Sequence, residues 1–436
     1  MPFVQPVVSA PRMKPLTCVA AAALVLGAVG SAWAQKPHYP TGPTPPRHAA
    51  GHATPAAKPA PVRKAEPQLN AEARLISVYR LIGQGKSRQA LAEAQTLVRD
   101  HPNFQLAQLI YGDLLSSQMR PLRALGDAPE HIANAAAPML AELREESALR
   151  LKALRERPPA GTVPSQLVAL SPRNKHVIAV DASRARLYLF ENTPQTGLKL
   201  VADYYISVGK SGIEKAAEGD LRTPLGVYFI TSALNRSSLK DFYGAGALPI
   251  NYPNPYDTIR GKTGSGIWLH GTPSNQFSRA PKATDGCVVL ANPDLERLMR
   301  TVEVRSTPVV IAPSLQWVNP AVLKAQRTAF EQTLGAWQAA RVSGNLAKVV
   351  SFYTSDFSSQ GKNFDQWLPS LEREVNAVAG RQSQTKDLSV LHWKDIAETM
   401  VVTFAELPAN ARTAPTRRQY WIKVHGQWKI FYEGIV

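Results

Sequence analysis

The sequence predicts a multidomain chain with a helical N-terminal region, a mostly-β middle domain and an α+β C-terminal domain. Three observations predict this order. Apolar residues recur at helical spacing over residues 70–157, and the period changes to two over residues 172–313. Residues 320–436 begin with a long helical pattern and end in strand-like runs, the order typical of an α+β domain. At roughly 100–200 residues per domain, the 436 residues suit about two to four units.

Residues 1–34 have the features of a secretory signal peptide. Arg12 and Lys14 precede a short apolar run at residues 19–29, and small residues around Ala34 form a cleavage site. The run is short for a segment that spans a bilayer. We therefore expect export to the periplasm with cleavage after Ala34, and an uncleaved membrane anchor is the alternative.

Residues 35–69 are rich in Pro and Ala, a composition that cannot bury a core, so we expect an extended disordered linker. The chain as a whole is basic, with 50 Lys and Arg against 33 Asp and Glu and a formal net charge of +17. A basic surface attracts polyanions, which include nucleic acid, anionic lipid and the anionic bacterial envelope. Because the sequence has no zinc-finger spacing and no aromatic RNA-binding motif, we expect no nucleic-acid partner.

Residues 70–157 predict helices separated by glycine and proline. Leu75, Val78 and Ile82 share one helical face, and Pro102 ends a second helix. The order of helix, Gly-containing turn, helix and Pro is similar to a tetratricopeptide unit, of which about one and a half fit here. Two roles stay open for this region: a platform for a protein partner, or a packing spacer.

The middle domain opens with a predicted hairpin. Strands at residues 176–181 and 186–190 flank a short turn at residues 182–184. The further strands that we expect are residues 200–208, 226–231, 267–270 and 308–311. Long loops separate these strands, and such loops commonly carry functional residues.

The C-terminal domain predicts helices at residues 321–340 and 345–353, followed by strands. The strands that we expect are residues 401–404, 420–424 and 428–432, and the last two are joined by a tight turn typical of a hairpin. This pattern resembles the cone-shaped NTF2-like fold, whose curved sheet surrounds a pocket and which often forms homodimers. We expect the tryptophans of this domain to line its core or pocket: Trp337, Trp393, Trp421 and Trp428.

The chain has two cysteines, Cys18 and Cys287, and cleavage of the signal peptide leaves Cys287 as the single thiol of the mature protein. Such a thiol is either a buried spectator or a reactive group. A cysteine attacks as the thiolate, which requires a base nearby. His270 ends a predicted strand, and the sixteen residues between it and Cys287 allow a loop that returns the thiol to the imidazole. We therefore predict Cys287 as the nucleophile and His270 as the general base and acid.

Backbone groups complete the predicted catalytic centre. The Asp285-Gly286 turn leaves the N–H groups of Gly286 and Cys287 facing one point, where they would stabilise an oxyanion. No carboxylate is placed to orient His270, so we expect the Gly271 carbonyl to accept the Nδ1 proton. This chemistry needs neither a metal nor a cofactor, and we predict none.

These residues resemble the motif of YkuD-type L,D-transpeptidases, which is a His-Gly pair, a variable loop, and then Ser/Thr-His-Gly-Cys. The chain has His270-Gly271 and Thr284-Asp285-Gly286-Cys287, and residues 223–228 match the upstream Thr-Pro-x-Gly-x-aromatic motif. The resemblance implies an envelope enzyme whose thiolate attacks the L-centre carbonyl of diaminopimelate in a peptidoglycan tetrapeptide stem. D-alanine leaves, and the acyl group passes to an amine in a transpeptidase or to water in an L,D-carboxypeptidase.

The chain departs from this motif at two positions. Asp285 stands where the family usually has His, and Val289 stands where it often has Arg. The missing cations leave open how the stem carboxylates bind, and the candidates to replace them are Arg279, Lys282 and Arg222. The predicted substrate-binding residues are Tyr243, Arg279, Thr284 and Asp285, with Tyr243 in an aromatic, Gly-rich loop at residues 241–250.

The domain order also resembles the Csd6-like branch, in which an NTF2-like domain follows the YkuD domain. Members of that branch are associated with trimming of stem peptides and with cell shape. We therefore predict a peptidoglycan L,D-transpeptidase with stem peptides as its partners. Two alternatives stay open: an L,D-carboxypeptidase or amidase that uses water, and a non-catalytic cell-wall-binding scaffold.

Overall fold

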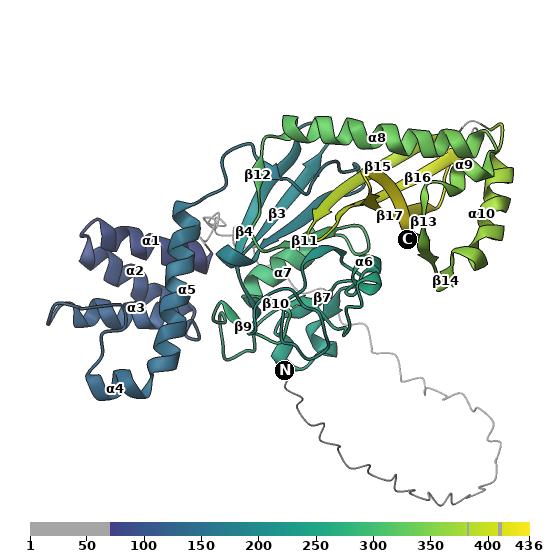
Figure 1. Ribbon diagram of the computed structural model, residues 1–436. Coiled ribbons are helices and arrows are strands. Elements are labelled where there is room, and N and C mark those ends of the chain that lie inside the picture. Colours follow the sequence, from purple (N-terminus) through teal and green to yellow (C-terminus); the bar gives the residue numbers. More distant parts are fainter. Residues whose placement is uncertain (1–69, 382, 409–411) are drawn as a thin grey trace, which may run out of the picture. The chain divides into compact units, whose positions relative to one another are not determined.

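Helices form in the N-terminal region where the sequence has apolar residues at helical spacing. The computed structural model describes residues 70–381, 383–408 and 412–436, and the expected signal peptide and linker lie outside them (Figure 1). The helices are α1 (Ala71–Gly83), α2 (Ser87–Asp100), α3 (Gln105–Ser116), α4 (Glu130–Ala135) and α5 (Ala137–Arg155). Asn70 caps α1 by accepting a hydrogen bond from the Ala73 N–H, and Leu75 and Val78 are fully buried. The predicted helical region is therefore confirmed.

The middle domain contains a ten-stranded mixed sheet. Its strands are β2 (His176–Asp181), β3 (Arg186–Thr193), β4 (Gly197–Gly209), β5 (Gly226–Phe229), β6 (Leu234–Asn235), β7 (Gly246–Pro249), β8 (Trp268–His270), β9 (Lys282–Thr284), β10 (Val288–Leu290) and β11 (Pro308–Ala312). The strand order is β5-β11-β2-β3-β4-β10-β8-β7-β6, and β9 pairs with β4. Strands β2 and β3 form the predicted hairpin, in which the Asp181 carboxylate accepts a hydrogen bond from the Arg184 N–H.

Two short strands of this sheet determine where the functional residues lie. Strands β8 and β10 are parallel neighbours, with Leu269 opposite Val288 and His270 opposite Val289. A parallel pair needs a connection that returns the chain to the same end of the sheet, and the long loop after β8 provides it. Helix α7 (Asn292–Thr301) follows β10 directly and buries Leu295 and Leu298 against the sheet. A short helix, α6 (Pro255–Ile259), precedes β8.

The C-terminal domain has the predicted α+β composition. Its elements are α8 (Pro320–Val342), α9 (Leu346–Val350), β13 (Tyr353–Ser359), β14 (Lys362–Asn363), α10 (Phe364–Val378), β15 (Ser383–Lys394), β16 (Glu398–Pro408), β17 (Thr416–Val424) and β18 (Gln427–Ile435). The strands form one sheet with the order β14-β13-β18-β17-β16-β15. In Figure 1, α8 runs along this sheet.

Some boundaries in this domain differ from the sequence expectation. The helix expected at residues 345–353 ends at Val350, and Tyr353 instead begins a strand that pairs with β18. Strand β15 was not expected, because its first half, Ser383–Asp387, is polar and has the composition of a loop. Pairing with β16 along most of its length stabilises it as a strand. Long-range pairing of this kind overrides local propensity.

Aromatic side chains and an ion network fill the inside of the C-terminal domain. Trp337, Trp421 and Trp393 are at most 5% exposed, as expected for core residues, and Trp428 packs against the same aromatic cluster as Trp337 and Trp421. Arg417 pairs with the buried Glu433 and with Glu374. The cavity that remains beside these charges has a volume of about 140 Å³. This cavity is small, and its lining carries Arg417, Glu374 and Glu433.

The middle and C-terminal domains share a hydrophobic core. Trp393 and Phe431 of the C-terminal domain belong to the same buried cluster as Val227 and Tyr228 of the middle domain. The Arg418 guanidinium lies 3.3 Å from the centre of the Phe229 ring. A two-stranded ladder of β1 (Val163–Pro164) and β12 (Trp317–Val318) also joins the segments that flank the middle domain. Because this surface is apolar and buried, the two domains hold each other in place.

Candidate active site

The register of β8 and β10 places the two predicted catalytic residues on neighbouring backbones. His270 is the last residue of β8, and Cys287 is the residue immediately before β10. Because His270 lies opposite Val289, Cys287 is two positions back along the neighbouring backbone, and adjacent strands lie about 4.8 Å apart. The contact between the thiol and the imidazole stays a prediction.

The His270 side chain is buried and held in one orientation. Its Nδ1 lies 2.7 Å from the Gly271 carbonyl oxygen, so Nδ1 donates its proton there and Nε2 carries the lone pair. Burial lowers the pKa of His270 to about 4; the contact with Gly271 opposes this shift, and the positive Arg279 adds to it. The rings of Phe242 and Tyr243 pack against the imidazole, with centroids 5.7 and 5.2 Å away. A neutral imidazole with an available Nε2 is the form that accepts a proton.

The surroundings of the Cys287 thiol favour its protonated form. Burial raises the pKa of Cys287, which a contact with the Trp268 backbone opposes. Its Sγ donates a weak hydrogen bond to the Gly266 carbonyl oxygen at 3.6 Å. Burial therefore favours the neutral form of both the imidazole and the thiol.

Two threonines hold the turn that carries Cys287. The Thr284 hydroxyl donates to the Cys287 carbonyl at 2.7 Å and accepts from the Gly286 N–H at 3.1 Å. The Thr223 hydroxyl donates to the Gly286 carbonyl and accepts from the Gly209 N–H, both at 2.9 Å. Both threonines are buried. The upstream motif therefore acts as a clamp on the turn before Cys287.

This clamp corrects two expectations about the turn. Thr284 was expected to bind substrate, but it is 2% exposed. Its hydroxyl both donates and accepts a hydrogen bond within the turn, so it positions the turn instead. The Gly286 N–H was expected to face an oxyanion, but it donates to Thr284. Gly286 is required for a different reason. Its φ is +124°, and a Cβ there would lie 2.7 Å from the Arg222 carbonyl oxygen.

Asn292 is a site residue that the sequence analysis missed. Its Oδ1 accepts from the Ala245 and Thr272 N–H groups at 2.8 and 3.2 Å, and its Nδ2 donates to the Thr272 carbonyl at 2.8 Å. A Cβ on Gly271 or on Gly244 would lie 2.1 Å from this Oδ1. The glycine after His270 therefore makes room for a side chain that joins the His270 loop to the Tyr243 loop.

The predicted substrate-binding residues lie at different distances from this centre. Arg279 lies beside it, with its guanidinium carbon 4.6 Å from the centre of the Phe242 ring. Tyr243 packs between Trp268 and His270, so its ring forms part of the wall. Asp285 is exposed and pairs with Lys210 at 2.9 Å. Of the expected ligands for a stem carboxylate, Arg279 has the most suitable position.

The other two cations proposed for that task are engaged elsewhere. Lys282 pairs with Glu145 of α5 at 3.7 Å, and Arg222 donates to the Ile213 carbonyl at 3.1 Å. Among the described residues, no group of three or more His, Cys, Asp or Glu side chains is arranged to hold a metal ion. None of the helices in the described ranges is both long enough and apolar enough to cross a bilayer.

The chain is similar to known families and to solved structures. The family model of the L,D-transpeptidase catalytic domain, YkuD, matches residues 175–311, and that of the Cds6 C-terminal NTF2-like domain matches residues 329–434. No curated protein matches the chain. Among solved structures, Bd1075 from Bdellovibrio bacteriovorus is 23% identical with a TM-score of 0.54, over 63% of this chain and 98% of that one. This similarity shows a shared fold.

A second solved structure, the helical cell shape determining protein Pgp2 from Campylobacter jejuni, is 20% identical with a TM-score of 0.48. The match covers 66% of this chain and 99% of that one. An L,D-transpeptidase from Mycobacterium smegmatis is 12% identical with a TM-score of 0.21, over 32% of this chain and 58% of that one.

Proposed function

Because the chain carries an L,D-transpeptidase catalytic domain followed by a Cds6-type C-terminal domain, we propose that it is a peptidoglycan L,D-transpeptidase. Its substrate is the tetrapeptide stem, and the bond that breaks joins the L-centre of diaminopimelate to D-alanine. One observation carries the proposal. The His270 imidazole is buried, neutral and oriented by the Gly271 carbonyl, and His270 is the last residue of β8, which pairs with β10 directly after Cys287.

The reaction begins when His270 Nε2 takes the thiol proton of Cys287. The thiol must first turn away from the Gly266 carbonyl, which holds it in the resting state. The sulfur then attacks the carbonyl carbon of the L-centre, and a carbon–sulfur bond forms while the carbonyl oxygen becomes an oxyanion. Since the Gly286 N–H is used by Thr284, the proposed oxyanion donor is the Cys287 N–H, with Gly286 contributing only if Thr284 releases it.

Collapse of the oxyanion breaks the bond to D-alanine. The imidazolium of His270 gives its proton to the departing amine, which leaves a thioester on Cys287 and a neutral imidazole. An acceptor amine then loses its proton to His270, attacks the thioester and releases the thiol. Burial keeps the pKa of His270 low, which makes the imidazolium a strong acid for the leaving amine.

Arg279 is the proposed ligand of a stem carboxylate. Its guanidinium adjoins Phe242, and the Phe242 ring adjoins the His270 ring, so the cation lies next to the reacting groups. Guanidinium binds carboxylate through charge-assisted hydrogen bonds. Asp285 is proposed to act indirectly, because it is already paired with Lys210. The proposal also includes export to the periplasm, which depends on residues 1–34 as a signal peptide.

Hydrolysis is the second candidate outcome of the same acyl-enzyme. Phe242 and Arg279 line a cavity of about 680 Å³, and the Phe242 ring packs against the His270 ring. Water in such a cavity competes with an amine for the thioester. With water as the acceptor, the enzyme would be an L,D-carboxypeptidase and would release a tripeptide stem.

Product analysis tests the proposal. Purified mature protein is incubated with disaccharide tetrapeptides, and the products are separated by chromatography and identified by mass. Crosslinked dimers with loss of one D-alanine are expected. Formation of the tripeptide alone would mean that the enzyme hydrolyses the stem and does not transpeptidate. The Cys287→Ala variant is expected to bind the tetrapeptide and form no product. Product formation by that variant would overturn the cysteine mechanism, and binding without turnover by the wild-type chain would favour a cell-wall scaffold.

A further inference from the structure

The helical region is attached to the loop that joins the two catalytic residues. The Phe277 ring stacks on Phe104, at the start of α3, with centroids 4.2 Å apart. The Phe277 N–H donates to the Asn103 carbonyl at 3.0 Å, and Asn103 Nδ2 donates to the Ser274 carbonyl at 3.1 Å. These contacts hold the loop at both Ser274 and Phe277.

Helix α5 holds the next part of the same loop. The Ser278 hydroxyl donates to the buried Glu146 carboxylate at 2.9 Å, and Glu146 also pairs with Arg150. The Arg150 guanidinium lies 3.9 Å from the centre of the Tyr205 ring, and the Tyr205 hydroxyl donates to the Arg279 carbonyl at 2.9 Å. Two neighbouring loop residues, Ser278 and Arg279, are therefore positioned by α5 and by the strand that packs against it.

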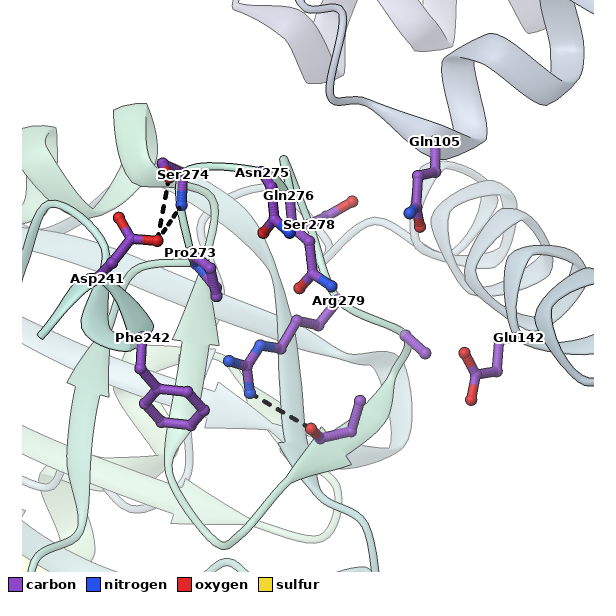
Figure 2. Close-up of a pocket in the computed structure, with 12 residues that line it drawn as sticks. Gln105, Glu142, Asp241, Phe242, Pro273, Ser274, Asn275, Gln276, Ser278 and Arg279 are labelled. Carbon is purple, nitrogen blue, oxygen red and sulfur yellow. Dashed lines mark hydrogen bonds between the residues drawn. The ribbon is translucent and has the colours of Figure 1, made fainter.

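A cavity of about 680 Å³ lies between these anchored parts. Gln105 of α3 and Glu142 of α5 line it from the helical region, and Asn275 and Gln276 line it from the loop (Figure 2). Within the described ranges, the side chains of these four form no hydrogen bond with the protein, so their polar groups are available to a ligand. The position of this wall is set by the contacts of the loop with α3 and α5.

The lining has the chemistry of a site for a hydroxyl-rich ligand. Amide side chains donate and accept at once, as sugar hydroxyls do, and carboxylates accept from hydroxyl groups. The exposed Phe242 ring supplies an apolar face. Two carboxylates, Glu142 and Asp241, outnumber the single guanidinium of Arg279, which disfavours a polyanion despite the basic composition of the chain.

We propose that this cavity binds the saccharide of the peptidoglycan strand, and that the helical region is thereby a substrate-binding part of the enzyme. The inference rests on the proposed function, because it takes the stem peptide as the substrate. In that substrate, three residues lie between the sugar and the scissile bond, and three extended residues span roughly 10 Å. The Phe242 ring lines the cavity and packs on His270, so the cavity opens within reach of the reacting groups.

A binding experiment separates this inference from the catalytic proposal. The full mature chain with Cys287→Ala is titrated by calorimetry with a disaccharide tetrapeptide and with the free tetrapeptide. The test variant adds Gln105→Ala and Glu142→Ala. The matched control adds Gln89→Ala and Glu130→Ala, which remove the same side-chain types from exposed helical positions outside the cavity.

The sugar-bearing ligand is expected to bind about tenfold more tightly than the free peptide to the parent and control chains, as expected for about two neutral hydrogen bonds. The test variant is expected to lose this preference and to bind the free peptide unchanged. Equal affinity of the parent chain for both ligands would overturn the saccharide site, and so would an equal loss for both ligands in the test variant. Binding of the free peptide without any preference leaves the catalytic proposal standing while the saccharide site fails.

Discussion

At the scale of single residues, the pKa of His270 decides how the proposed enzyme responds to pH. Burial lowers that pKa to about 4, so the imidazole stays a neutral base throughout the neutral range. As pH falls through about 4, the imidazole takes up a proton and can no longer accept one from the thiol. We predict that the acidic limb of kcat/KM lies near this value, well below the ordinary histidine pKa of about 6.5. An acidic limb near pH 6.5 would contradict the buried, neutral imidazole.

Arg279 carries the second prediction at this scale. Because it is the proposed ligand of a stem carboxylate, Arg279→Ala is expected to raise KM about 10- to 100-fold, the effect of one lost charge-assisted hydrogen bond. Lys282→Ala is the matched control. Its ammonium pairs with Glu145 at an exposed position, so little change is expected. If both substitutions raise KM equally in steady-state kinetics, Arg279 contributes only its positive charge and does not bind the carboxylate directly.

At the scale of structural elements, the turn before Cys287 depends on the Thr223 clamp. Thr223→Val keeps the shape of the side chain and removes the hydroxyl that donates to the Gly286 carbonyl. A buried carbonyl without a partner costs about 1–3 kcal/mol, so the unfolding free energy should fall by this amount and kcat should fall more than KM changes. Thr231→Val is the control, since that hydroxyl is at an exposed position. Urea unfolding and steady-state kinetics on both variants test the clamp.

The loop after β8 depends on space at Gly271. A Cβ there would lie 2.1 Å from Asn292 Oδ1, which must move and give up its hydrogen bonds to the loop. We predict that Gly271→Ala lowers the unfolding free energy by about 1–3 kcal/mol and abolishes turnover. In α8, Gly335→Ala meets no atom within 4 Å and is expected to stabilise the chain by up to about 1 kcal/mol. If Gly271→Ala and Gly335→Ala change the unfolding free energy equally, Asn292 does not restrict the residue at position 271.

The sequence predicted the elements of this site better than their connections. Cys287, His270 and Gly271 could be proposed from the sequence because thiol, imidazole and a following carbonyl are recognisable from residue type and order. Asn292 was missed because it follows a strand at the start of a helix, where Asn is an ordinary residue, and its partners Ala245 and Thr272 lie far along the chain. Thr284 was assigned to substrate because its burial depends on how the turn packs, which its neighbours in sequence do not reveal.

At the scale of the whole molecule, we predict that the shared core makes the middle and C-terminal domains unfold as one cooperative unit. Trp393 is 5% exposed and lies in the cluster that includes residues of the catalytic sheet. Trp393→Ala is expected to lower the unfolding free energy by about 3–5 kcal/mol. In urea, activity and the structure of the C-terminal domain should then be lost together, at a lower urea concentration than in the parent chain. Ile396→Ala, at an 86% exposed position, is expected to change stability by less than about 0.5 kcal/mol. Two separate transitions in the parent chain would contradict the shared core.

The sequence by itself determined the order of the three regions, and it predicted a nucleophile, its base and the carbonyl that would orient the base. These features depend on local periodicity and on residue chemistry. Only the tertiary structure decided how they are used: the Gly286 N–H is taken by Thr284, Arg279 rather than Lys282 lies beside His270, and the helical region forms a wall of the cavity. The physical reason is that hydrogen bonds and packing between residues far apart in the chain depend on the path of the loops, which residue order alone does not specify.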